Sequence, residues 1–95
     1  MKILLKEEID TKLNNLDDRW ALVNGSVLER VFMFKNFDET VEFINRVANC
    51  ADRYKKYPDL EITENKATVR ISTKKLNGLV SQDFALAQSI DISEN

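Results

Sequence analysis

The chain has 95 residues, 43% of them hydrophobic and 32% charged, with only two glycines and one proline. This composition is typical of an ordered globular protein, and the length predicts one domain over residues 1–95 whose modest core would benefit from oligomerisation. Fourteen basic and sixteen acidic residues give a net charge of −2 without a basic block, which excludes nucleic acid as an expected partner. The first apolar run spans three residues, too few for a signal peptide or a membrane span, so we expect a cytoplasmic protein.

The absence of histidine restricts the chemistry most strongly. Histidine is the side chain whose ordinary pKa suits acid–base work near neutral pH, and it is the commonest metal ligand. Cys50 is the only cysteine, which excludes an internal disulfide and a thiolate cluster, and its place in a predicted helix indicates a buried thiol. We therefore expect no metal and no cofactor.

The first third of the chain predicts a helix followed by a hairpin. Apolar residues at spacings of four, four and three predict a surface helix over residues 6–16: Leu5, Ile9, Leu13 and Leu16. Residues 19–23 and 27–35 read as strands, and the Asn24-Gly25 pair between them is a strong hairpin signal because both residues tolerate positive φ.

The second strand alternates, and one of its faces carries an arginine among aromatic residues: Leu28, Arg30, Phe32 and Phe34. Arg30 either lies at the sheet margin with its stem packed and its head in water, or lines a pocket. The first reading is favoured, because long basic side chains commonly bury their stems in this way.

The longest predicted helix begins after Asn36, which caps it together with Glu39. Its apolar positions follow at four, three, four and three: Phe37, Val41, Ile44, Ala48 and Ala51. The helix should end near Tyr54, because Pro58 cannot continue the backbone ladder and disfavours a helical residue before it.

A second hairpin and a last helix complete the chain. Leu60 and Ile62 alternate with polar residues, residues 64–66 can turn, and residues 67–72 alternate again. Residues 81–90 predict a helix with Phe84, Ala87 and Ile90 inward, and Asp83 is placed to favour its N-terminal dipole. The predicted fold is therefore α+β, a four-stranded antiparallel sheet with three helices on one face in the order α-β-β-α-β-β-α.

These residues resemble the pterin-4a-carbinolamine dehydratases, also called dimerisation cofactors of a homeodomain transcription factor. The resemblance covers most of the chain and implies the same order of elements. It rests on Trp20, Leu28-x-Arg30-x-Phe32-x-Phe34-x-x-Phe37, Pro58-Asp59, Gly78-Leu79-x-x-x-Asp83 and Leu86-Ala87-x-x-Ile90-Asp91.

The positions at which that family carries its catalytic histidines are occupied here by other residues. The resemblance places Lys56, Tyr57 and Lys74 there, with the family spacing of sixteen residues from Pro58 to Lys74 retained. An acidic residue of the family survives as Asp52.

Two further family positions also differ. An aromatic of the second hairpin is Glu64, and the threonine that caps the last helix is Val80, which leaves Ser81 as a substitute cap.

The leading hypothesis is a dehydratase-fold protein that has lost the chemistry and acts by binding another protein, as a homodimer or a dimer of dimers. Some dehydratase-like proteins without the catalytic residues are Rubisco assembly factors of α-carboxysomes, and the sequence of residues 57–60 resembles that branch. Rubisco is therefore the specific partner considered, with a carboxysome-associated location. The surface we expect to matter comprises Asp52, Lys56, Tyr57, Pro58, Asp59, Lys74 and Asp83.

Two alternatives remain open. The first alternative is an active 4a-hydroxytetrahydrobiopterin dehydratase, a hydro-lyase that uses Lys56, Tyr57 or Lys74. The second alternative is a module that binds a pterin without turnover. Lysine and tyrosine have reference pKa values of about 10.4 and 10, so a competent base at neutral pH would need a depression of roughly three units. Such a depression would require the two lysines to face each other in a desolvated pocket.

Overall fold

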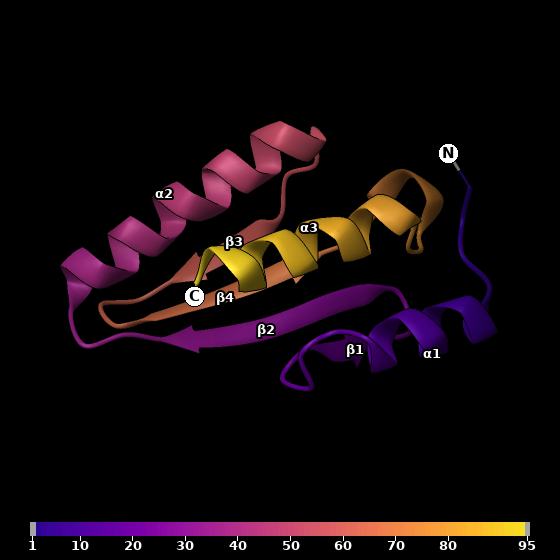
Figure 1. Ribbon diagram of the computed structural model, residues 1–95, viewed down its shortest axis with the longest axis horizontal. Helices are drawn as coiled ribbons and strands as arrows, with labels where there is room; N and C mark the ends of the chain where they lie inside the picture. Colours follow the sequence, from indigo (N-terminus) through magenta and orange to yellow (C-terminus); the bar gives the residue numbers. More distant parts are fainter. Residues whose placement is uncertain (1, 95) are drawn as a thin grey trace.

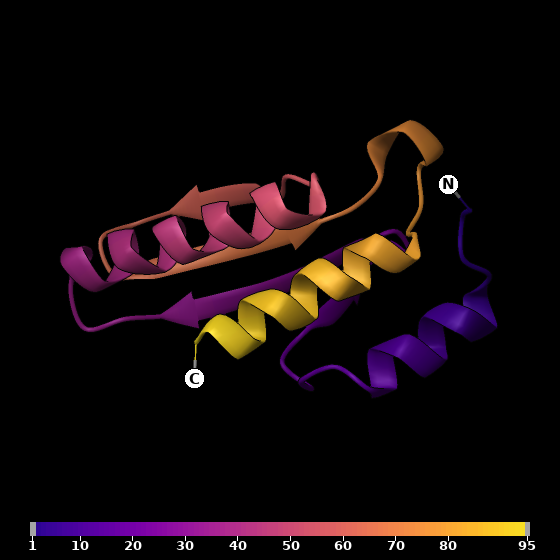
Figure 2. The ribbon, with the colours of Figure 1, turned by 45° about the horizontal axis from the view of Figure 1, so that its top comes forward.

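Three helices lie against a four-stranded antiparallel sheet (Figures 1 and 2). The structure is a computed structural model that describes residues 2–94, and it confirms the predicted α+β class and order of elements. The helices are α1 (Lys6–Asn14), α2 (Phe37–Tyr54) and α3 (Ser81–Ser93), with a short 3-10 turn η1 (Lys74–Leu76) before α3. The strands are β1 (Ala21–Val23), β2 (Val27–Met33), β3 (Asp59–Ile62) and β4 (Lys66–Ile71). None of the helices within residues 2–94 is long and apolar enough to cross a membrane.

The strand order is β1-β2-β4-β3, so the two hairpins meet along β2 and β4 at the centre of the sheet. Asn24 and Gly25 both have positive φ, at 53° and 70°, which confirms the predicted turn of the first hairpin. Arg30 pairs with Val69 across the centre. β1 and β3 are the edges, and β3 is exposed along its whole length.

The long helix α2 packs through Phe43, whose ring centroid lies 4.5 Å from that of Phe32 and 5.1 Å from that of Phe34. Asn36 Oδ1 accepts a hydrogen bond from Glu39 N at 2.9 Å, which confirms the predicted cap. The buried face consists of Thr40, Phe43, Val47, Cys50 and Ala51.

The predicted apolar stripe of α2 was wrong. Phe37 and Val41 are 53% and 41% exposed, and only Ala51 of that stripe is fully buried. Two overlapping sets of apolar residues on α2 both follow the helical period. The set that contains Phe43 is the buried one, because Phe43 packs against the aromatic residues of β2. The prediction of a buried Cys50 is confirmed.

Arg30 is buried rather than snorkelling, so the favoured prediction for this residue was also wrong. Its side chain is 7% exposed, and its Nη1 lies 2.7 Å from Asp91 Oδ1. The guanidinium carbon lies 4.2 Å from the centre of the Phe32 ring. Trp20 Nε1 donates to the same Asp91 carboxylate, so an arginine and an indole together hold one partly buried acid of α3.

The helix α1 is shorter than predicted and ends at Asn14, and Leu5 points away from the core at 60% exposure. Ile9 is buried as expected. The residues before α1 join the fold, because Leu4 N donates to Leu79 O at 2.8 Å and Leu4 is 8% exposed. The predicted inward residues of α3, Phe84, Ala87 and Ile90, are all buried.

Candidate functional site

The candidate site begins where α2 ends. Lys55 adopts the left-handed conformation at φ 55°, and Lys56 N donates to Ala51 O at 3.1 Å. This backbone pattern is typical of helix C-termini and reverses the direction of the chain. The reversal turns the Lys56 side chain inward, and Pro58 then leads into β3.

Lys56 enters a buried polar network. Its Nζ donates to Thr73 Oγ1 at 2.7 Å and lies 3.1 Å from Asp83 Oδ1. The Thr73 hydroxyl in turn donates to Asp83 Oδ2 at 2.9 Å. The side chains of Lys56 and Asp83 are 14% and 0% exposed, so an ammonium and a carboxylate neutralise each other out of contact with most of the solvent.

Asp83 also caps α3. Val80 N donates to Asp83 Oδ2 at 2.8 Å, so the carboxylate satisfies a backbone donor at the start of the helix and lies at the positive end of its dipole. The predicted placement of Asp83 is confirmed, whereas the predicted Ser81 cap was wrong because the capping residue is Val80. One carboxylate therefore links three segments: the exit of α2, the end of β4 and the start of α3.

Tyr57 points away from this network and is 66% exposed. Its hydroxyl donates to Asp52 Oδ1 at 3.2 Å. This hydrogen bond to a carboxylate, together with some desolvation, raises the pKa of Tyr57 above its usual value, because ionisation would break the bond and place two anions side by side. Tyr57 is therefore a poorer proton donor than an ordinary tyrosine.

Lys74 and Asp59 form a third pair, which is largely in solvent. Lys74 Nζ lies 3.0 Å from Asp59 Oδ2, and the two side chains are 74% and 57% exposed. Both residues line a shallow hollow of about 300 Å³ that Thr73 and Gly78 also border. Lys56 and Tyr57 do not line this hollow.

The structure thus gathers the predicted residues into three separate pairs, and Pro58 alone among them makes no polar side-chain contact. Thr73, which joins the buried pair, was not among the predicted site residues. Nothing in its sequence position marks it, because its role depends on residues 17 and 10 positions away along the chain. Within residues 2–94, no group of three or more acidic or cysteine side chains is arranged to hold a metal ion.

The structure therefore shows an α+β fold in which one helix ends in a lysine-tyrosine-proline turn beside a four-stranded sheet and a buried aspartate caps the next helix. A family model described as pterin 4 alpha carbinolamine dehydratase matches residues 2–92. The chain belongs to this family.

Similar proteins are found by sequence and by structure. The chain is 36% identical over 92 residues to a Rickettsia bellii protein named "Putative pterin-4-alpha-carbinolamine dehydratase", covering 97% of this chain and 81% of the relative. A Sulfurisphaera tokodaii protein of the same name is 38% identical over 91 residues, covering 96% of both chains.

Two solved structures are also similar. A transcriptional coactivator/pterin dehydratase from Brucella melitensis has a TM-score of 0.88 at 26% identity and covers 96% of this chain and 97% of its own. A pterin dehydratase-like protein described as a RuBisCO assembly factor in the alpha-carboxysome has a TM-score of 0.63 at 16% identity, covering 78% of this chain and 84% of its own. The second likeness concerns the fold alone.

Proposed function

We propose that this chain is a protein-binding member of its family that does not dehydrate pterins. The observation that carries the proposal is the engagement of the three residues at the family's histidine positions. Lys56 contacts Asp83, Tyr57 contacts Asp52, and Lys74 contacts Asp59. Lys74 and Asp59 border the hollow described above, and neither Lys56 nor Tyr57 lines it.

The dehydration of a 4a-hydroxytetrahydropterin needs one group that protonates the leaving hydroxyl and another that accepts a proton from the ring nitrogen. Both must change protonation state near the working pH. The Lys56 ammonium instead compensates a fully buried carboxylate, so its deprotonation would leave Asp83 without its ionic partner. Lys74 is largely in solvent and paired with Asp59, so it does not border a dry reaction site.

The exposed edge strand β3 supports a role in protein binding, and we propose that it first pairs with β3 of a second copy of the chain. β3 has no partner on its outer side within residues 2–94. Leu60 and Ile62 are 37% and 45% exposed on the face that α2 covers, and Phe37 and Val41 expose apolar surface on α2 itself. Antiparallel pairing of two β3 strands about a two-fold axis would satisfy the edge and join these apolar surfaces.

A charge placed on that edge tests the dimer. We expect light scattering to give a dimer mass for the wild type and a monomer mass for Ile62→Lys, because an edge lysine opposes strand pairing. Val31→Lys is the matched control, since Val31 is also 45% exposed but lies on the central strand β2 and the opposite face. A monomeric wild type at all accessible concentrations, or equal effects of the two lysines, would exclude this interface.

Rubisco is the specific partner that we propose beyond the second copy. The support is the resemblance of residues 57–60 to the assembly-factor branch, together with the fold shared with one such factor. Co-expression of this chain with the two Rubisco subunits should raise the yield of assembled enzyme, and the chain should co-purify with it. Unchanged yield together with no co-purification would exclude this partner while leaving other proteins to be tested.

An active dehydratase is the second candidate, because relatives at 36% and 38% identity carry that name. It predicts faster formation of the quinonoid dihydropterin from the carbinolamine than in buffer, with the acceleration lost in Lys74→Met and Tyr57→Phe. We expect a rate equal to that in buffer. Any acceleration that these two variants abolish would overturn the non-catalytic proposal.

Pterin binding without turnover is a separate outcome. A fluorescence titration of the wild type with a reduced pterin measures it directly. Saturable binding that Lys74→Met weakens, with no acceleration of dehydration, would assign the chain to this class.

A further inference from the structure

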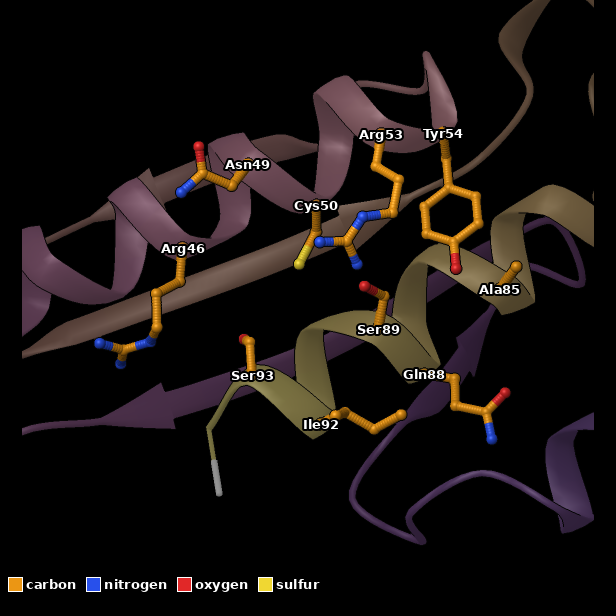
Figure 3. Close-up of a pocket in the computed structure, with 10 residues that line it drawn as sticks. All are labelled: Arg46, Asn49, Cys50, Arg53, Tyr54, Ala85, Gln88, Ser89, Ile92 and Ser93. Atoms are coloured by element: carbon orange, nitrogen blue, oxygen red, sulfur yellow. The ribbon is translucent and has the colours of Figure 1, made fainter.

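A second polar surface lies between α2 and α3, and no residue of the candidate site lines it. It is a groove of about 430 Å³, bordered on one side by the last three turns of α2 and on the other by α3 (Figure 3). Cys50, at 4% exposure, lies at its floor, and Ile92, at 65% exposure, lies at its rim. The groove therefore offers apolar contacts along its length as well as polar ones.

The groove carries one uncompensated positive charge in a chain whose net charge is −2, because Arg46 is paired with Glu94 whereas Arg53 has no carboxylate partner within residues 2–94. Two arginines, Arg46 and Arg53, border it, and none of its lining residues is acidic. The remaining polar groups, which include Ser89, Gln88 and Tyr54, are neutral and can donate hydrogen bonds. Such a lining is complementary to an anion.

The two arginines differ in what already holds them. Arg46 Nη2 lies 2.6 Å from Glu94 Oε1, and its guanidinium carbon lies 5.9 Å from the Phe43 ring centre. Arg53 makes no side-chain hydrogen bond or ion pair with any other residue of the described part of the chain. Figure 3 shows its guanidinium reaching over the groove toward the Ser89 hydroxyl. Arg53 is exposed and its donors face solvent, and the Nε of Arg46 is buried without a hydrogen-bond partner, so both guanidinium groups offer donors to a ligand.

We propose that this groove binds a small molecule that carries a carboxylate or phosphate group. The anionic group pairs with the Arg53 guanidinium, whose planar fork of donors matches the oxygens of either group. Ser89 donates from α3, and the rest of the molecule lies along the groove over Cys50 toward Ile92. This groove is separate from the candidate site at the end of α2 and does not depend on the function proposed above.

The proposal competes with a simpler role for Arg53. The residue lies in the last turn of α2, where a cation interacts favourably with the helix dipole and needs no ligand. The two roles differ in one measurable respect. A helix-end arginine responds to ionic strength in general, whereas a binding site saturates with one anion and depends on the guanidinium shape.

The experiment is a titration of ¹⁵N-labelled protein with inorganic phosphate and, separately, with hexanoate, at constant ionic strength. We expect saturable shifts of the Arg53 Nε–H resonance and of the Ser89 amide. Binding should weaken about tenfold or more in Arg53→Gln and partly in Arg53→Lys, which keeps the charge but loses the fork. Tighter binding of hexanoate would assign a carboxylate with an apolar body, and tighter binding of phosphate would assign a phosphate.

Lys75→Gln is the matched control, because Lys75 is an exposed lysine of η1 outside the groove and its replacement removes the same charge. It should bind like the wild type. Shifts that do not saturate, or an equal loss of binding in Lys75→Gln and Arg53→Gln, would overturn the proposal and leave Arg53 with the helix-end role alone. The amide spectrum of each variant shows whether it is folded.

Discussion

The pairs Lys56–Asp83 and Lys74–Asp59 have the same two side-chain types at nearly the same distance, 3.1 Å and 3.0 Å. They differ in burial: the first pair is 14% and 0% exposed, and the second is 74% and 57% exposed. An ion pair in solvent exchanges one good environment for another, whereas a buried charge has no alternative partner once its counterion is removed. The same chemistry therefore has a structural consequence at Lys56 and almost none at Lys74.

The sharpest way to break this comparison is to remove the buried ammonium. Lys56→Met should lower the free energy of unfolding by about 3–5 kcal/mol, because it leaves the Asp83 carboxylate buried without its counterion. Urea denaturation followed by circular dichroism measures the loss. The double variant Lys56→Met, Asp83→Asn should recover part of it, and a loss as small as that of an exposed pair would show that water reaches Asp83.

The hydroxyl that joins the buried pair should matter less than the charge. Thr73→Val removes the acceptor for Lys56 and the donor to Asp83, and should cost about 1–3 kcal/mol of stability. Thr73→Ser keeps the hydroxyl and serves as the matched control for the lost polar contacts. A larger loss of stability in Thr73→Ser than in Thr73→Val would mean that packing of the Thr73 methyl group, rather than the hydrogen bonds, is what counts.

Removing the exposed Lys74–Asp59 ion pair should have a much smaller effect on stability than removing the buried one. Lys74→Met should change the free energy of unfolding by between zero and about 1 kcal/mol, and the change should shrink further in high salt. The same urea titrations measure it at low and high ionic strength. A loss comparable to that of Lys56→Met would mean that Lys74 makes a buried contact in solution.

The smallest effect concerns Tyr57, whose raised pKa comes from its hydrogen bond to the Asp52 carboxylate. A folded-state pKa above the unfolded value means that the stabilising contribution is present below pH 10.0 and is lost as pH rises through the folded-state pKa. Ultraviolet titration of Tyr54→Phe, which leaves Tyr57 as the only tyrosine, should show ionisation above the usual range. Adding Asp52→Asn should return it toward normal, and no change would assign the shift to another neighbour.

Local signals in the sequence were sufficient to predict most of the fold. The Asn36 cap, the Asn24-Gly25 turn and the exit before Pro58 each depend on residues within a few positions of one another. The burial of Arg30 could not be predicted in this way, because its partner Asp91 is 61 residues away. The inward face of α2 was missed for a related reason: Phe37 and Phe43 both fit a helical stripe, and only the position of Phe32 decides between them.

In the candidate site, too, the local positions of the residues were predictable and their long-range contacts were not. The sequence placed Lys56, Tyr57 and Lys74 at the ends of elements, where the structure also finds them. It could not reveal that each would meet a different aspartate, since the pairs close over 27, 5 and 15 residues through the packing of α2, β3 and α3. Thr73 was missed because a threonine at a strand end carries no signal of a buried partner.

Residues near the start of the chain contact the segment that supports the candidate site. Leu4 bonds to the backbone of Leu79, and the Ile3 side chain lies against Gly78, where any added Cβ would force it to move. Both contacts fall on the segment that leads into α3 and hence onto the cap made by Asp83. Deleting the first residues of the chain would therefore remove contacts that support the start of α3 and the Asp83 cap. A peptide tag at the carboxyl end would instead lie near Ser93, which borders the α2–α3 groove. Expression of the protein with a carboxyl-terminal tag suits studies of the first site, and an amino-terminal tag suits studies of the second.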